Sequence, residues 1–186
     1  MKKIICLSYL LLIASGLVAQ KKFKFQSQNY VGFLEGNNGS AFQFQTINGF
    51  QRGTIFLGIG AGLDWYLYRS IPLFLSLNKD WTLSNRTFFV SLDGGTNFCW
   101  EKRSFDGWSD IISSDFSPAF YGGVGVGYKA FLKNKRDAVI INLGYSFKRL
   151  KETQTKRVFV QGGSPEIKEY YDYETSRLSI RLGWQF

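Results

Sequence analysis

Hydrophobic and polar residues alternate along most of this chain, and the alternation is especially clear over residues 54–68 and 177–186. In the second segment one face is entirely apolar and carries Leu178, Ile180, Leu182, Trp184 and Phe186. The opposite face carries Arg177, Ser179, Arg181, Gly183 and Gln185. Because successive side chains of a strand point to opposite faces, this period of two predicts β-strands with one apolar and one polar face.

The same period recurs in eight segments that are separated by turns and loops. We predict strands over residues 24–35, 41–50, 54–68, 71–78, 87–100, 119–132, 138–150 and 177–186. The connections after the second and sixth strands are tight, whereas those after the fifth and seventh are long. An even number of strands with short turns on one side and longer loops on the other is typical of outer-membrane barrels. The sequence therefore predicts an all-β fold, an eight-stranded antiparallel transmembrane β-barrel.

The polar face distinguishes this barrel from a secreted, lipocalin-like barrel, whose apolar face would surround a ligand. Glycine occupies alternate positions of this face, at 58, 60 and 62 and again at 123, 125 and 127. Glycine weakens a solvent-facing strand, whereas small residues inside a narrow barrel make room for larger neighbours. We therefore expect the polar face to line the lumen and the apolar face to contact lipid, with the lipocalin-like barrel as the alternative.

A few charged residues lie on the predicted lumenal face. They are Asp64, Asp93, Lys129, Lys148, Arg177 and Arg181. Because an unpaired buried charge is costly, we expect them to form a charge network in which opposite signs meet. If Asp64 and Asp93 met each other instead, they could act as a catalytic carboxylate pair. Neutralisation of neighbouring cations is the interpretation that a filled barrel interior favours.

The first residues have the features of a secretory signal peptide, with Lys2 and Lys3, an apolar run over 4–14 and small residues over 15–19. We predict cleavage after Ala19, or alternatively after Gly16, and a barrel domain over residues 20–186. Removal of the two lysines changes the net charge from +9 to +7. This excess fits anionic lipid or a negative cell surface, or merely solvated loops, and export argues against a nucleic-acid partner.

The chain contains no histidine, and residues 20–186 contain one cysteine, Cys99. A serine or water nucleophile at neutral pH usually needs a histidine as its base or orienting group. Zinc and copper sites commonly use histidine ligands, and one cysteine cannot build a thiolate cluster. We therefore predict no enzymatic activity, no metal site and no cofactor.

Two long connections, residues 101–118 and 151–175, are the candidate binding surfaces, because function tends to lie on loops. Aromatic residues stand among charged ones there, and we select Trp108, Tyr170, Tyr171 and Tyr173 as possible contacts for a surface glycan or protein. Alternatively, the strands continue beyond the membrane as a β rim whose residues pair across it, which the apolar run over 158–160 favours.

Five segments carry a family resemblance. They are the Ala19-Gln20 junction, residues 45–50, 58–65 and 71–74, and the terminal Trp184-Gln185-Phe186. In this order they resemble the small outer-membrane β-barrel proteins of the OmpA/OmpX-like superfamily, in the form common in Bacteroidota. The resemblance implies a location in the outer membrane of a Gram-negative bacterium, surrounded by outer-membrane lipid. It also implies insertion by the outer-membrane assembly machinery, which reads the last strand, so that Trp184 and Phe186 would be the insertion signal. It transfers no catalytic residue.

These features together predict a non-enzymatic outer-membrane barrel with a filled lumen and a structural or surface-interaction role. A narrow channel for ions or small solutes is an alternative, because the glycine rows could leave a path through the lumen.

Overall fold

The computed structural model describes residues 22–36, 39–101, 110–134, 136–158 and 164–186. The predicted signal peptide therefore lies outside the described residues. Within the described ranges, no helix is long and apolar enough to cross a membrane.

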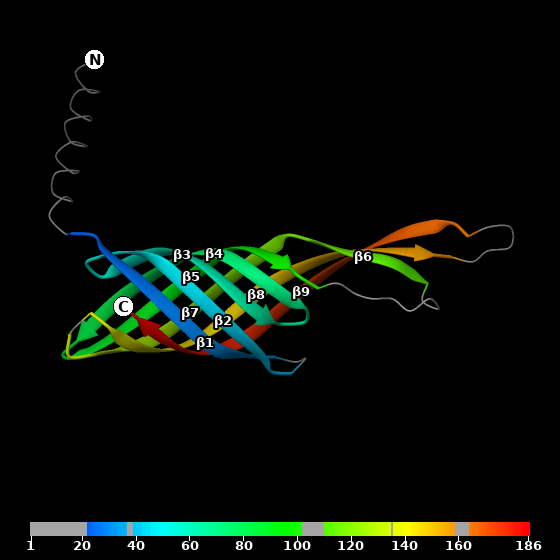
Figure 1. Cartoon of the computed structure of the whole chain (residues 1–186). Coiled ribbons are helices and arrows are strands. Elements are labelled where there is room, and N and C mark those ends of the chain that lie inside the picture. Colours follow the sequence, from blue (N-terminus) through cyan, green and yellow to red (C-terminus); the bar gives the residue numbers. More distant parts are fainter. Residues whose placement is uncertain (1–21, 37–38, 102–109, 135, 159–163) are drawn as a thin grey trace, which may run out of the picture.

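The described part of the chain folds into nine antiparallel strands (Figure 1). They are β1 (Lys24–Glu35), β2 (Ala41–Arg52), β3 (Ile55–Trp65), β4 (Arg69–Leu83), β5 (Arg86–Cys99), β6 (Ile111–Ser117), β7 (Ala119–Phe131), β8 (Ala138–Arg157) and β9 (Glu166–Gln185). Eight of them form a closed ring in the order β1, β2, β3, β4, β5, β7, β8 and β9, and β9 pairs again with β1. The predicted all-β, eight-stranded antiparallel barrel is confirmed.

The ring closes between the first and last strands. Residues 28–35 of β1 pair with residues 178–185 of β9, from Gln28 opposite Gln185 to Glu35 opposite Leu178. Two backbone hydrogen bonds extend this seam, because Ser27 and Phe186 exchange N–H to oxygen bonds of 2.9 and 3.0 Å. No edge of the ring is therefore left open along this seam, as a membrane-spanning sheet requires.

The strands β8 and β9 continue well beyond the ring, which differs from the prediction. They pair along their whole length, up to Arg157 opposite Glu166, and β6 adds a third strand on the β8 side. Figure 1 shows this three-stranded extension projecting from one end of the barrel, while the start of β1 and the end of β9 lie at the other. The strands predicted over 138–150 and 177–186 were too short, and β6 was not predicted. The extension corresponds to the alternative of a β rim.

The apolar face of each strand points outward. In β9, Leu178, Ile180 and Leu182 are each more than half exposed, whereas the alternating residues Ser179 and Arg181 are buried. This is the reverse of a lipocalin-like barrel, in which the apolar face surrounds the interior.

The lumen is packed with large side chains. A buried cluster consists of Tyr30, Ile47, Phe56, Phe74, Phe89, Tyr121 and Ile140. The glycine rows leave room for these rings, because a methyl group at position 60 would lie 2.4 Å from the Phe74 ring. A methyl group at position 127 would lie equally close to the ring of Phe89. Glycine and aromatic residues thus fill the interior in pairs.

We predict that Gly60→Val lowers the free energy of unfolding by about 1–3 kcal/mol, because the new side chain must displace the Phe74 ring. Urea unfolding in detergent micelles, followed by tryptophan fluorescence, measures the change. Gly94→Val is the matched control, because a methyl group there meets no atom within 4 Å. Phe74→Leu should restore part of the loss in the Gly60→Val background. Equal destabilisation by the two valines would contradict this packing.

Candidate functional site

The first of three ion pairs found among the described lumenal residues joins Lys148 of β8 to Asp64 of β3. Both side chains are buried, and the Lys148 ammonium also donates to Ser70 Oγ at 3.0 Å. The ammonium lies 4.6 Å from the ring centre of Tyr66 and 5.5 Å from that of Tyr121. The cation is therefore enclosed by one carboxylate, one hydroxyl and two aromatic faces, which together replace its water shell.

The second pair joins Arg181 of β9 to Asp93 of β5, with 3.6 Å between Nη1 and Oδ2. The guanidinium donates to Gln45 Oε1 at 2.6 Å and twice to Asn142 Oδ1, at 3.0 and 2.7 Å. Ser76 Oγ donates to the other Asp93 oxygen at 2.6 Å. Three strands, β2, β5 and β8, thus supply partners for one arginine, which compensates for burying its charge.

The third pair, between Lys129 of β7 and Asp80 of β4, includes a residue that sequence reasoning missed. The Lys129 ammonium lies 2.9 Å from Asp80 Oδ1, and Gln51 donates to the same carboxylate at 3.0 Å. The predicted strand ended at Asn78, but β4 continues to Leu83. The signal that could have revealed Asp80 was the period of two, because Asn78 and Asp80 continue to alternate with outward-facing residues.

Arg177 was predicted to join the charge network, but it has a different role. Its guanidinium donates to the carbonyl oxygens of Leu34, Gly39 and Tyr66 and lies 5.0 Å from the Tyr66 ring centre. These bonds connect β9 to the end of β1, to the segment that follows β1 and to the residue directly after β3. Arg177 therefore holds the backbone at Leu34, Gly39 and Tyr66 together at the mouth of the barrel, next to the extension.

The two aspartates that could have formed a catalytic pair have separate partners. Asp64 contacts Lys148, and Asp93 contacts Arg181. Each also accepts a hydrogen bond from a serine hydroxyl. This arrangement neutralises charge and does not place one carboxylate against the other. Among the described residues, no group of three or more potential metal ligands is close enough to hold a metal ion.

An aromatic surface is formed by Tyr68, from the turn between β3 and β4, together with Phe116, Tyr171 and Tyr173 of the extension. The rings of Tyr171 and Tyr173 are nearly parallel, at 8°, with centres 6.1 Å apart. Tyr68 lies 4.9 Å from Phe116 and 6.4 Å from Tyr173 between ring centres. Tyr170 points to the opposite face and is 78 % exposed, so only two of the predicted tyrosines lie together. The fourth candidate, Trp108, lies outside the described residues.

Polar groups border the aromatic surface. Lys156 lies 2.5 Å from Glu169 and donates to the Tyr171 hydroxyl at 3.0 Å. The hydrogen bond with Glu169 raises the pKa of Lys156, and the bond from Lys156 lowers the pKa of Glu169. Both groups are therefore charged at neutral pH. The buried carboxylate of Glu152 accepts hydrogen bonds from Gln154, at 2.7 Å, and from Ser114 on β6.

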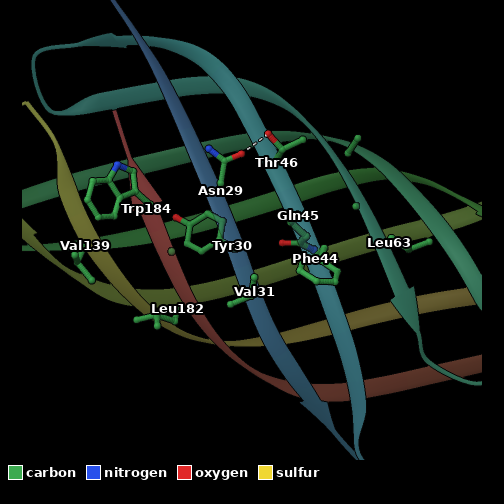
Figure 2. A pocket seen from close by; sticks show the side chains of 13 residues that line it. Asn29, Tyr30, Val31, Phe44, Gln45, Thr46, Leu63, Val139, Leu182 and Trp184 are labelled. Atoms are coloured by element: carbon green, nitrogen blue, oxygen red, sulfur yellow. Dashed lines mark hydrogen bonds between the residues drawn. The ribbon is translucent and has the colours of Figure 1, made fainter.

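A shallow groove of about 790 Å³ lies on the outer face of the barrel, where β9, β1, β2 and β3 run side by side (Figure 2). Its outward-facing wall residues include Val31, Phe44, Leu63, Leu182 and Trp184. Thr46 Oγ1 donates to Asn29 Oδ1 at 2.8 Å across this surface. Trp184 therefore lies on the apolar exterior, as does Phe186 at the end of the same strand.

Comparison with known proteins gave structural matches only. No protein-family model matches the chain, and no curated protein matches it. The N-terminal β-barrel domain of Pseudomonas aeruginosa OprF superimposes with a TM-score of 0.52 at 9 % identity, covering 89 % of this chain and 98 % of that domain. The outer membrane protein AlkL, determined in lipid bilayers, gives a TM-score of 0.51 at 14 % identity and covers 90 % of both chains. This chain has the fold of an outer-membrane β-barrel. At these identities, the likeness concerns the fold alone.

We predict that Lys148→Met destabilises the barrel by about 3–5 kcal/mol, because it leaves the buried Asp64 carboxylate without its cation. The double variant Asp64→Asn/Lys148→Met should recover much of that loss. Urea unfolding in micelles measures both changes.

The neighbouring residue provides the control for this variant. Arg149→Met removes an exposed ion pair with Glu174 and should cost no more than about 1 kcal/mol. If Arg149→Met were as destabilising as Lys148→Met, the buried pair would not be the reason for the effect.

Proposed function

We propose that this protein is a non-enzymatic barrel of the Gram-negative outer membrane that presents the β6–β8–β9 extension at the cell surface as a binding element. The main observation that supports the location in the membrane is the apolar exterior of the barrel. Large apolar side chains on β3, β4, β7 and β9 are more than half exposed, among them Ile59, Leu75, Val126 and Leu178. An apolar belt of this extent is stable only when lipid covers it, and a closed barrel satisfies its backbone hydrogen bonds within the bilayer.

The unequal lengths of the connections between strands support an orientation in which the extension faces the cell exterior. At the end where β1 starts and β9 ends, the turns between β2 and β3, between β4 and β5, and between β7 and β8 are short. Outer-membrane barrels have their short turns in the periplasm and their longer segments outside the cell. The extension, at the opposite end, then faces the exterior (Figure 1).

The lumen supports a structural role in preference to a channel. Seven large side chains form one cluster across it, and three ion pairs occupy further space. Eight-stranded barrels are narrow enough for side chains to fill them completely. At the glycines that could have left a path, an added methyl group would meet neighbouring atoms, which belong to aromatic rings at Gly60 and Gly127 and to Ser91 and Asn142 at Gly125.

The aromatic surface supports binding of a surface glycan or a protein. Flat tyrosine faces next to carboxylates and an amide suit the stacking and hydrogen bonding that sugars and peptide side chains require. The three-stranded extension holds these rings in register, so little ordering is needed on binding. The last strand, with Trp184 and Phe186 on its outer face, is the element proposed for the assembly machinery to recognise.

Cysteine labelling on intact cells tests location and orientation. In a Cys99→Ser background, Tyr170→Cys on the extension should react with a membrane-impermeant maleimide. Lys133→Cys, in the turn after β7, should react only after the outer membrane is permeabilised. Labelling with the reverse pattern, or recovery of the protein in the soluble periplasm without detergent, would contradict the proposal.

Planar bilayers test the filled lumen. The wild-type protein should show no steady conductance, whereas Phe56→Ala/Phe89→Ala should conduct because it removes two of the lumenal rings. A steady wild-type conductance that Gly125→Asn abolishes would establish the channel alternative.

A glycan array and a surface-protein array, each screened with the solubilised barrel, test the binding element. We expect Tyr171→Ala/Tyr173→Ala to weaken any specific binding at least tenfold. Tyr170→Ala, on the opposite face of the same strand, should leave it unchanged. Equal losses in the two proteins would show that the aromatic surface is not the binding site.

A further inference from the structure

A second pocket lies at the end of the barrel that is opposite the extension, close to both ends of the described chain. Its volume is about 850 Å³, within the range of small-molecule sites. The start of β1, the turn between β2 and β3, the turn between β7 and β8 and the end of β9 surround it. It is formed by segments unrelated to the aromatic surface and is separate from the proposed binding element.

The pocket has a strongly positive rim. Lys22, Lys24 and Arg136 line it from two different segments, and none of the lining residues that the structure describes is acidic. The Asp80 carboxylate behind Gln51 is paired with Lys129. Three cations that converge on one concave site, with low-dielectric walls around it, produce a field that attracts anions.

Buried amides form the second part of the site. Gln26 is 5 % exposed and Gln185 is 2 % exposed, and the Oε1 atom of each has no hydrogen-bond partner among the described residues. The Gln185 amide nitrogen donates to the Arg136 carbonyl oxygen at 3.3 Å, which holds the cationic turn at the pocket. A buried acceptor without a partner costs about 1–3 kcal/mol, so a ligand that donates to it gains affinity.

We propose that this pocket binds a phosphate group that carries neighbouring hydroxyls, such as a glycerol phosphate. The cations match the phosphate, and the glutamine oxygens accept from the hydroxyls. The same chemistry exists in a free polyol phosphate and in the headgroup of phosphatidylglycerol. Phe25, Phe131 and Phe186 on the pocket wall are exposed, and exposed aromatic side chains at the end of a barrel are suited to the level of the lipid headgroups.

Titration calorimetry on the full chain in phosphatidylcholine nanodiscs tests the site, with sn-glycerol 3-phosphate as probe and glycerol as the uncharged comparison. We expect saturable binding of glycerol phosphate that weakens at higher salt, and none of glycerol. Inorganic phosphate should bind at least fivefold more weakly. Equal affinity for inorganic phosphate would overturn the role of the hydroxyls.

Variants localise the binding. Lys24→Gln/Arg136→Gln should weaken it at least tenfold, and Gln26→Leu should reduce the preference over inorganic phosphate. Arg149→Gln/Lys151→Gln is the matched control, because it removes the same charge from exposed positions near the extension. Circular dichroism establishes that each variant is folded. An unchanged affinity in the Lys24→Gln/Arg136→Gln protein would overturn the proposal.

Native mass spectrometry distinguishes the two sources. Retention of phosphatidylglycerol over phosphatidylcholine, lost in Lys24→Gln/Arg136→Gln, would assign the site to a lipid headgroup. Binding of soluble glycerol phosphate without such retention would assign it to a free phosphate. Absence of both would refute the site.

Discussion

The structure depends on one constraint, which is that every backbone N–H and C=O group within a lipid layer needs a partner from the chain itself. A sheet meets this constraint only by closing, and here it closes through the pairing of β1 with β9. The bonds between Ser27 and Phe186 continue that pairing to the last residue. Once the ring is closed, the pleat sends alternate side chains outward to lipid and inward to the lumen, so the two faces follow from the closure.

Closure with only eight strands creates a narrow interior, and the contents of that interior follow from its width. Aromatic rings fill space efficiently, but they need neighbours without side chains, and Gly60 and Gly127 provide that space. A charged residue can enter only where an opposite charge or several hydrogen bonds replace its water shell, as Arg181 shows with Asp93, Gln45 and Asn142. The lumen resembles the core of a soluble protein in its density, although it is bounded by a membrane-facing wall.

Within the lipid layer, the sequence could predict most of the fold, because lipid and lumen impose opposite preferences on alternate residues. For this reason the closing strand over residues 177–186 and the inward position of the glycine rows could both be predicted from the sequence. Beyond the membrane neither face of a strand meets lipid, so the apolar alternation disappears even where one face is buried, as at Glu152. The outer parts of β8 and β9 and the whole of β6 are instead specified by cross-strand pairs such as Lys156 with Glu169, which need the register to be known.

Side-chain partners were less predictable than strands. The period of two places Arg177 in the lumen correctly, but its partners are carbonyl oxygens of segments distant in sequence. Asp80 was not predicted as a lumenal residue, because Lys79 interrupts the apolar face before Trp81 and Leu83 resume it. The three tyrosines over residues 170–173 were predicted to act together because they are close in sequence. The strand places Tyr170 on one face and Tyr171 and Tyr173 on the other.

The packed lumen also limits how the two ends of the barrel can act on each other. Because rings and ion pairs from most of the strands interlock there, neither a ligand nor a strand can move through it without breaking several buried contacts at once. A coupling of even 1–3 kcal/mol between two sites requires an element with two arrangements, and an interior of this kind offers none. Any partner of the extension and any ligand of the opposite mouth should therefore bind independently, and the barrel serves as a rigid support for both.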